Sequence, residues 1–175
     1  MSIFTTRTNR CIIQRKKTRE RATAVRINTK CSIALHCLVL ISEFQDRTKV
    51  TSELLAQSTG CNSAAIRSIL SALQKTGIIS VARGIGGAHL IRKPEEITMW
   101  EIYHALEPDG LAHFIGLHPN PSDQCPVGRC IETVLTDAYK EIGASVRTAM
   151  EQTTLQQLLD DYREINASGY GENRR

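Results

Sequence analysis

The sequence has few aromatic residues and no long hydrophobic run. Aromatic side chains make up 5% of its 175 residues, and there is one tryptophan. The most apolar stretch, from Ile33 to Ile41, is interrupted by His36 and is much shorter than the roughly 20 apolar residues that span a bilayer. Among the early cations only the pair Ile12–Ile13 is apolar, which does not make a secretory leader. We therefore expect a cytoplasmic protein with no membrane partner.

Cysteine is present, but without the context of a disulfide scaffold. The six cysteines stand at positions 11, 31, 37, 61, 125 and 130. In a chain without a leader they are expected to stay mostly reduced. Cys31, Cys37 and Cys61 fall in or beside apolar helical stripes, so we predict that they pack as small apolar side chains.

The residue patterns of an enzyme active site are also missing. We find no general base, no paired carboxylates and no phosphate-binding loop at the spacing of a defined pocket. The glycines at 84, 86 and 87 lack the full dinucleotide-binding spacing, and they precede a predicted strand instead of a helix. The sequence therefore predicts that the protein is not an enzyme.

Positive charge is concentrated near the N-terminus. The formal net charge is +4, but the first 30 residues hold nine Lys/Arg and one Glu, which leaves 13 Lys/Arg against 17 Asp/Glu in the rest. The mildly acidic part of the chain after residue 30 would have to bind DNA through local basic patches. Residues 1–24 have no periodicity and predict a disordered basic extension. It could be a DNA-touching arm, or sequence ahead of a true start near Val25, where VRINTKCSIALH begins.

Three helices are predicted in the next part of the chain. After Asn28, a good N-cap, an apolar stripe from Ile33 to Ile41 predicts a helix that ends near Phe44. Thr51 can cap a short helix that stops at Gly60. Asn62 can cap a third helix with the buried stripe Ala65, Ile66, Ile69, Leu70 and Leu73, ended by Gly77. Two short helices joined by a turn with glycine match a helix-turn-helix.

A β-hairpin is predicted directly after this pair. Residues 78–82 and 88–91 are rich in β-branched or aliphatic side chains, and the turn between them holds three glycines. A hairpin in this place is a wing. The fold class is therefore mainly α with a small β-hairpin, and residues 25–107 are predicted to form a winged helix-turn-helix domain that ends with a short helix after the capping box Thr98 and Glu101.

The C-terminal part is predicted to form dimerisation helices. Residues 108–126 are rich in Pro, Gly and Asp and predict a loop that contains cysteine. Residues 127–165 predict a long helix from Val127 and a final helix with a capping box of Thr154 and Gln157, and 166–175 a disordered tail. The long helix has an apolar stripe that a small body cannot cover, which favours a homodimer. The stripe consists of Ile131, Val134, Leu135, Ala138, Ile142, Val146 and Ala149.

The stretch from Gly77 to Thr98, GIISVARGIGGAHLIRKPEEIT, combines a hydrophobic strand, Arg-Gly at the turn, a Gly-Gly pair followed by Leu, and a Pro four residues before a Thr. In these features the sequence resembles the Rrf2 (BadM-type) family of bacterial winged-helix transcriptional regulators. The resemblance covers residues 26 to about 164. It implies a homodimeric regulator, often a repressor, that binds a palindromic operator in double-stranded DNA.

A recognition helix needs short polar or cationic side chains opposite its buried stripe. Arg67 is predicted to read a guanine, and its place matches a specificity position of the family. Arg83 at the hairpin tip is predicted to enter the minor groove, with Gly84 and Gly87 permitting the turn and a close approach. The remaining predicted DNA contacts are Asn62, Ser63, Ala64 and Ser71 on the third helix, and Lys49, Thr51 and Ser52 at phosphates.

The cysteines before the long helix leave three interpretations open. Some family members hold an iron–sulfur cluster on three cysteines with at least five residues between neighbours. This chain has Cys125 and Cys130 with four residues between them, and near the first position only His118, so no cofactor or metal is expected and a cluster on these three residues is the minor alternative.

The second interpretation is a thiol switch, and the alternative function for the chain is accordingly a thiol-based redox sensor or a redox accessory protein that uses Cys125 and Cys130. A dimeric protein-interaction module without DNA binding is a third class, which the acidic charge of residues 31–175 supports. A helix N-terminus stabilises a thiolate, so Cys125, which stands just before Pro126, would react first and Cys130 would resolve it as a disulfide. In the third interpretation both are ordinary reduced thiols, with Cys130 partly buried.

Overall fold

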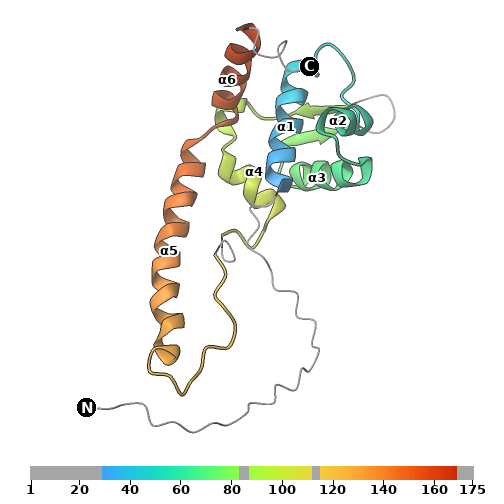
Figure 1. The fold of residues 1–175 in the computed structure, drawn as a ribbon. Coiled ribbons are helices and arrows are strands. Elements are labelled where there is room, and N and C mark those ends of the chain that lie inside the picture. The colour runs from blue at the N-terminus through green and yellow to red at the C-terminus, as the bar shows by residue number, and fades with distance from the viewer. Residues whose placement is uncertain (1–28, 83–86, 112–114, 169–175) are drawn as a thin grey trace, which may run out of the picture.

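The computed structural model describes residues 29–82, 87–111 and 115–168 (Figure 1). The predicted basic extension 1–24 and the predicted N-cap Asn28 lie outside these residues, as do Arg83 and Gly84, which the sequence predicts at the tip of the hairpin. In the described part, no helix combines the length and the apolar character that crossing a membrane requires.

The first three helices form the centre of the body. α1 (Thr29–Phe44) places Ala34, Cys37, Leu38 and Ile41 in the core, the stripe predicted from the sequence. α2 (Ser52–Thr59) begins at the cap Thr51 and ends at Gly60, whose φ of 68° is the left-handed conformation that favours glycine. α3 (Ser63–Lys75) buries Ile66, Ile69, Leu70 and Leu73. The predicted helices and their caps at Thr51 and Asn62 are therefore confirmed.

A short antiparallel hairpin follows α3, as predicted. β1 (Ile79–Val81) pairs with β2 (Ala88–Leu90), with Ile79 opposite Leu90. Two hydrogen bonds fasten the second strand to the segment ahead of α2: the amide of Ala88 donates to the Val50 carbonyl (2.9 Å), and the amide of Leu90 donates to Oε1 of Gln45 (2.8 Å). The wing is thus fixed to the start of the helix pair and not only to the end of α3.

The rest of the chain forms a 3₁₀ turn η1 (Pro94–Glu96) and the helices α4 (Met99–Leu106), α5 (Gly128–Gln152) and α6 (Leu155–Ala167). Both predicted capping boxes are present, at Thr98 and at Thr154. The C-terminal part of α5 lies beside α4, its N-terminal part projects beyond the body, and α6 packs next to α1 (Figure 1). α6 continues to Ala167, so the predicted start of the tail at 166 falls two residues too early.

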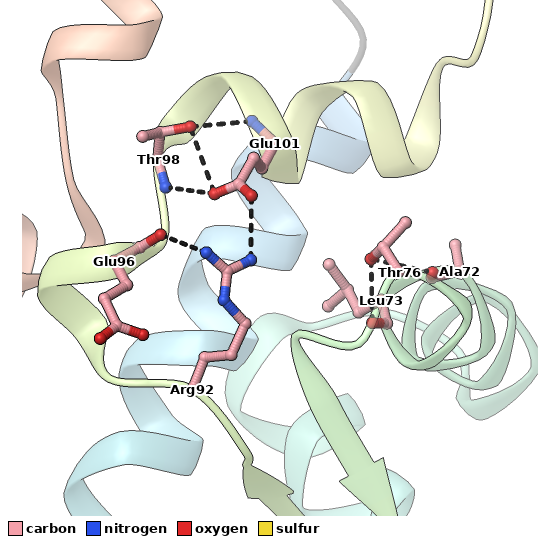
Figure 2. Close-up of polar contacts among 7 residues, drawn as sticks. All are labelled: Ala72, Leu73, Thr76, Arg92, Glu96, Thr98 and Glu101. Atoms are coloured by element: carbon pink, nitrogen blue, oxygen red, sulfur yellow. Dashed lines mark hydrogen bonds and ion pairs between the residues drawn. The ribbon is translucent and has the colours of Figure 1, made fainter.

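An arginine after the wing braces the start of α4 (Figure 2). Arg92 donates to Oε1 of Glu101 (2.9 Å) and to the Glu96 carbonyl, while Oε2 of Glu101 accepts from the Thr98 amide (3.0 Å). Partial burial acts to raise the pKa of Glu101, but the hydrogen bonds from Arg92 and Thr98 outweigh it and hold this pKa below its usual value. The ionised capping box therefore ties the wing to α4.

The two capping boxes lie side by side. Thr98 and Thr154 form an isolated antiparallel bridge, in which the Met99 amide donates to the Thr153 carbonyl and the Leu155 amide donates to the Ile97 carbonyl, both at 2.8 Å. Ile97, Leu155 and Leu159 are fully buried beneath this bridge. The junction between α5 and α6 is thus attached to the junction between the wing and α4.

We predict that the two caps are energetically coupled. Thr98→Ala and Thr154→Ala should each lower the free energy of unfolding by about 1 kcal/mol, because each removes a side-chain acceptor from a helix start. The double variant should deviate from additivity by about 0.5 kcal/mol or more, since the backbone bridge joins the two sites. Urea unfolding measures all three values. Thr51→Ala combined with Thr154→Ala is the matched control and should be additive, and an additive Thr98–Thr154 pair would refute the coupling.

Candidate nucleic-acid interface

α3 has the two faces that a recognition helix requires. Its buried stripe holds the helix against the body, and Ile66 and Leu73 are 0% exposed. On the opposite side Ala64, Arg67, Ser71 and Gln74 are exposed. Because these residues recur every three or four positions, they form one row along the helix. Arg67 is the cation at the centre of that row, with 60% of its side chain exposed.

This row borders a shallow hollow of about 340 Å³ between the start of α2, α3 and the wing. The hollow brings together five of the residues predicted from the sequence, which are Thr51, Ser52, Arg67, Ser71 and Gly87. Two further residues on its lining, Glu53 and Gln74, were missed. Gln74 stands seven positions after Arg67, so helical spacing alone could have found it.

The other predicted contacts are placed around this hollow. Lys49 is exposed just ahead of α2, and Ala64 is exposed on the first turn of α3, where Ser63 is half-buried. Asn62 is exposed, and its side-chain oxygen accepts from the Ala65 amide at 2.8 Å. Thr51 in the same way accepts from the Leu54 amide at 3.2 Å. Both cap residues therefore use a side-chain acceptor within their own helix start.

Gly87 packs inside the protein. It is buried, and a Cβ at this position would lie 2.6 Å from the Val50 nitrogen and 2.9 Å from its carbonyl oxygen. Such a contact with backbone atoms is too short for any side chain. The structure therefore shows one close approach that this glycine permits, to Val50, and its approach to a DNA groove stays a prediction.

An acidic residue faces the predicted base-reading arginine. Glu53 Oε1 lies 3.8 Å from Arg67 Nη1, and 66% of the Glu53 side chain is exposed. The pKa of Glu53 is lowered by its own backbone amide at the start of α2 and by the Ser52 hydroxyl, which donates to it at 3.1 Å. The carboxylate therefore stays ionised at neutral pH, and it offsets part of the positive charge that Arg67 brings to the surface.

The cysteines divide into a buried group and an exposed pair. Cys37 is fully buried, and this burial raises its pKa to about 12, while Cys31 and Cys61 are half-buried. Cys125 and Cys130 are both exposed at the start of α5, so the expectation of a partly buried Cys130 is wrong for the single chain. In the described residues, no three His, Cys, Asp or Glu side chains are grouped so that they could hold a metal ion.

Comparison of the sequence with known proteins finds relatives that are named as transcriptional regulators. The sequence model of the Rrf2 family, described as an iron-dependent transcriptional regulator, matches residues 27–161. The chain is 33% identical over 135 residues to YwnA of Bacillus subtilis, named as an HTH-type transcriptional regulator, over 77% of this chain and 95% of YwnA. MT1325 of Mycobacterium tuberculosis, which has the same type of name, is 27% identical over 164 residues, covering 86% of this chain and 98% of the relative.

Solved structures share the fold. A structure of a transcriptional regulator from Lactobacillus plantarum superposes with a TM-score of 0.66 at 28% identity, over 84% of this chain and 99% of the other. IscR of T. potens superposes with a TM-score of 0.60 at 18% identity, over 79% and 89% of the two chains, which shows a common fold. The predicted fold class is therefore confirmed. The family description mentions iron, and in the part of the chain that the structure describes His118, Cys125 and Cys130 do not form a group of metal ligands.

Proposed function

The chain belongs to the Rrf2 family of transcriptional regulators, and we propose that it binds a palindromic DNA operator as a homodimer and represses transcription from the promoter it covers. The observation that carries the proposal is the exposed row of α3 beside the wing, with Arg67 at its centre. An α-helix fits the major groove, and an arginine can donate two hydrogen bonds to guanine O6 and N7. Such a protein acts on chromosomal DNA in the cytoplasm.

The contacts around Arg67 would divide into base reading and positioning. Ser71 and Gln74 stand one and two turns after Arg67 on the same row, which suits them to neighbouring base edges. Lys49 and the Ser52 hydroxyl lie where the start of α2 would approach phosphates. We assign Arg83 at the tip of the wing to the minor groove, as the sequence predicts.

The long helix supports a homodimer. None of its 25 residues is buried in the single chain. Two large apolar residues, Val134 and Ile142, are 61% and 43% exposed to solvent. The residues of the predicted apolar stripe recur along one side of α5 over about five turns. A second copy, packed stripe to stripe, would cover this side and place two recognition helices on the two halves of a palindrome.

One measurement separates this proposal from a redox accessory protein or a protein-interaction module. Binding to duplex DNA should weaken steeply as salt increases, because the protein would displace counterions from phosphates. Duplexes selected from a random pool should share two inverted half-sites. Absence of salt-dependent retention on duplex DNA would refute the proposal.

Arg67→Ala should lower affinity for the selected operator by about 1–3 kcal/mol, because one bidentate base contact is lost, with little effect on random duplex. Glu53→Gln should strengthen binding to both duplexes at low salt, and by a larger factor to random duplex, since a carboxylate beside Arg67 repels phosphates. Fluorescence anisotropy over a salt series measures both variants. Arg129→Gln, an exposed cation on α5, is the control and should behave as wild type. Equal weakening of Arg67→Ala on both duplexes would make Arg67 a phosphate contact.

Ile142→Asp should yield monomers, because it places a charge in the centre of the apolar stripe. Operator affinity should fall by about a hundredfold, since two linked half-site contacts become independent. Sedimentation velocity and anisotropy measure the two effects. Thr133→Asp introduces the same charge on an exposed position away from the stripe and should remain dimeric. A dimeric Ile142→Asp variant would place the interface elsewhere.

A thiol switch is a second candidate function, favoured by the exposure of both Cys125 and Cys130 at one end of α5. A peroxide would oxidise the Cys125 thiolate to a sulfenic acid with release of water or hydroxide, and the Cys130 thiol would displace a second water to form the disulfide. Operator affinity should then differ between reductant and mild peroxide, and Cys125→Ser should abolish the difference. Cys31→Ser serves as the control. Equal wild-type affinity under both conditions would eliminate the switch.

A further inference from the structure

A second and larger hollow lies away from the DNA-facing surface. It has a volume of about 660 Å³ and is enclosed by α4, the segment that follows it and the middle of α5. Its size is within the range of small-molecule sites, about 300–1,000 Å³. The residues that matter for its chemistry are Trp100 and His104 from α4, Leu111 from the following segment, and Tyr139, Lys140 and Arg147 from α5.

The α4 wall offers flat rings. Trp100 stacks on His104 with centroids 5.6 Å apart and planes 15° apart, and on Tyr103 at 5.9 Å and 28°. Of these rings, Trp100 and His104 line the hollow, and with Leu111 and Tyr139 they form a mostly apolar lining that includes flat rings. Aromatic faces prefer offset or stacked contact with another flat ring. The wall therefore favours a planar ligand over a bulky or branched one.

The α5 wall offers positive charge. The Arg147 guanidinium lies over the Trp100 ring at 4.9 Å from its centroid, and Lys140 stands two turns earlier on the same face of the helix. Only the Nε of Arg147 donates to Glu151 (2.8 Å), which leaves most of its N–H donors directed elsewhere. Lys140 pairs with Asp137 at 3.5 Å, but both side chains are more than 70% exposed (72% and 76%), so water weakens the pair.

The carboxylates on the lining are fewer than the cations. Asp109 lines the hollow, whereas Asp137 and Glu151 do not. The lining therefore holds two cations and one carboxylate, and a ligand with one negative charge would balance the remaining positive charge. Because a guanidinium binds a carboxylate through two parallel hydrogen bonds, the geometry suits a carboxylate at the edge of a ring.

We propose that this hollow binds a small aromatic carboxylate, with its ring against Trp100 and His104 and its carboxylate accepting from Arg147 and Lys140. The hollow lies on a different side of α5 from the proposed dimer stripe. Its α5 residues, such as Tyr139, Gly143 and Arg147, recur on one side of the helix, while Val134, Ala138 and Ile142 of the dimer stripe lie on another.

The hollow also lies between the proposed dimerisation helix α5 and the helices that would contact DNA, and a regulator must connect these two parts of the molecule. This regulatory role rests on the proposed function. α4 packs against the recognition helix α3 on one side and against α5 on the other. A ligand wedged between α4 and α5 would change their separation, and with it the spacing of the two recognition helices in a dimer. The bound acid should therefore change affinity for the operator.

The single tryptophan of the chain is Trp100, so its fluorescence reports this hollow alone. The full chain, without DNA, is titrated with benzoate and with nicotinate. Benzamide and nicotinamide are the uncharged matches, and cyclohexanecarboxylate is the non-planar match. We expect a saturable change with at least one aromatic acid, and binding at least about tenfold weaker for its amide, because the charge-assisted hydrogen bonds are lost. No saturable response to either acid, or equal binding of acid and amide, would overturn the site.

Substitutions on α5 test whether the fluorescence change arises from binding in this hollow. Arg147→Gln should weaken binding of the acid at least about tenfold, Arg147→Lys less, and Arg129→Gln, on the same helix outside the hollow, not at all. Operator binding is then measured with and without the acid. Unchanged operator affinity in the presence of saturating acid would refute the coupling. A protein that binds its operator but not the acids would refute the ligand site and leave the proposed function intact. A protein that binds an acid but not DNA would refute the proposed function and leave the ligand site intact.

Discussion

The backbone bridge between Thr98 and Thr154 is the contact on which the arrangement of the two halves depends. α5 buries none of its residues in the single chain, so no core of its own holds it against the body. The chain instead returns from α5 through the bridge, and α6 anchors the junction with buried Leu155 and Leu159 and with an ion pair from Arg163 to Glu43 at 2.8 Å. The helix that carries the apolar stripe is thus oriented from its C-terminal end, while its flank packs against α4 and the segment that follows α4.

This arrangement makes α4 the mechanical link of the molecule. One side of α4 meets the recognition helix, and its start is held by the Arg92 and Glu101 brace that leads to the wing. Its other side meets α5 across the hollow lined by Trp100. A change at α5, whether from a thiol, a ligand or a partner copy, therefore reaches α3 and the wing through one helix of eight residues. Because the brace is ionised and hydrogen-bonded at both ends, α4 and the wing should move as a unit.

The parts of the fold that depend on neighbours in sequence could be predicted, and the parts that depend on distant pairs could not. Helix starts at Thr51, Thr98 and Thr154 and the stop at Gly60 follow from short-range capping chemistry. The pairing of Thr98 with Thr154 joins residues 56 positions apart, and no periodic pattern in the sequence predicts it. The close approach of Gly87 to Val50 was missed for the same reason, since Val50 comes from a segment far away in the sequence. Glu53 was overlooked because an acidic residue in a first helical turn is ordinary, and only the fold brings it to Arg67.

The position of Glu53 gives a physical reason for an acidic body in a DNA-binding family. A surface with many uncompensated cations would bind any duplex through its phosphates, and specificity would then be a small difference between two strong affinities. A carboxylate 3.8 Å from Arg67 weakens attraction to phosphates in general, while in the proposed complex a guanine in the correct place would accept two hydrogen bonds from the arginine. The pair therefore lowers total affinity and increases the contrast between operator and random DNA. On this view the mild negative charge of residues 31–175 is compatible with DNA recognition, because contrast and not total attraction is what locates an operator in a genome.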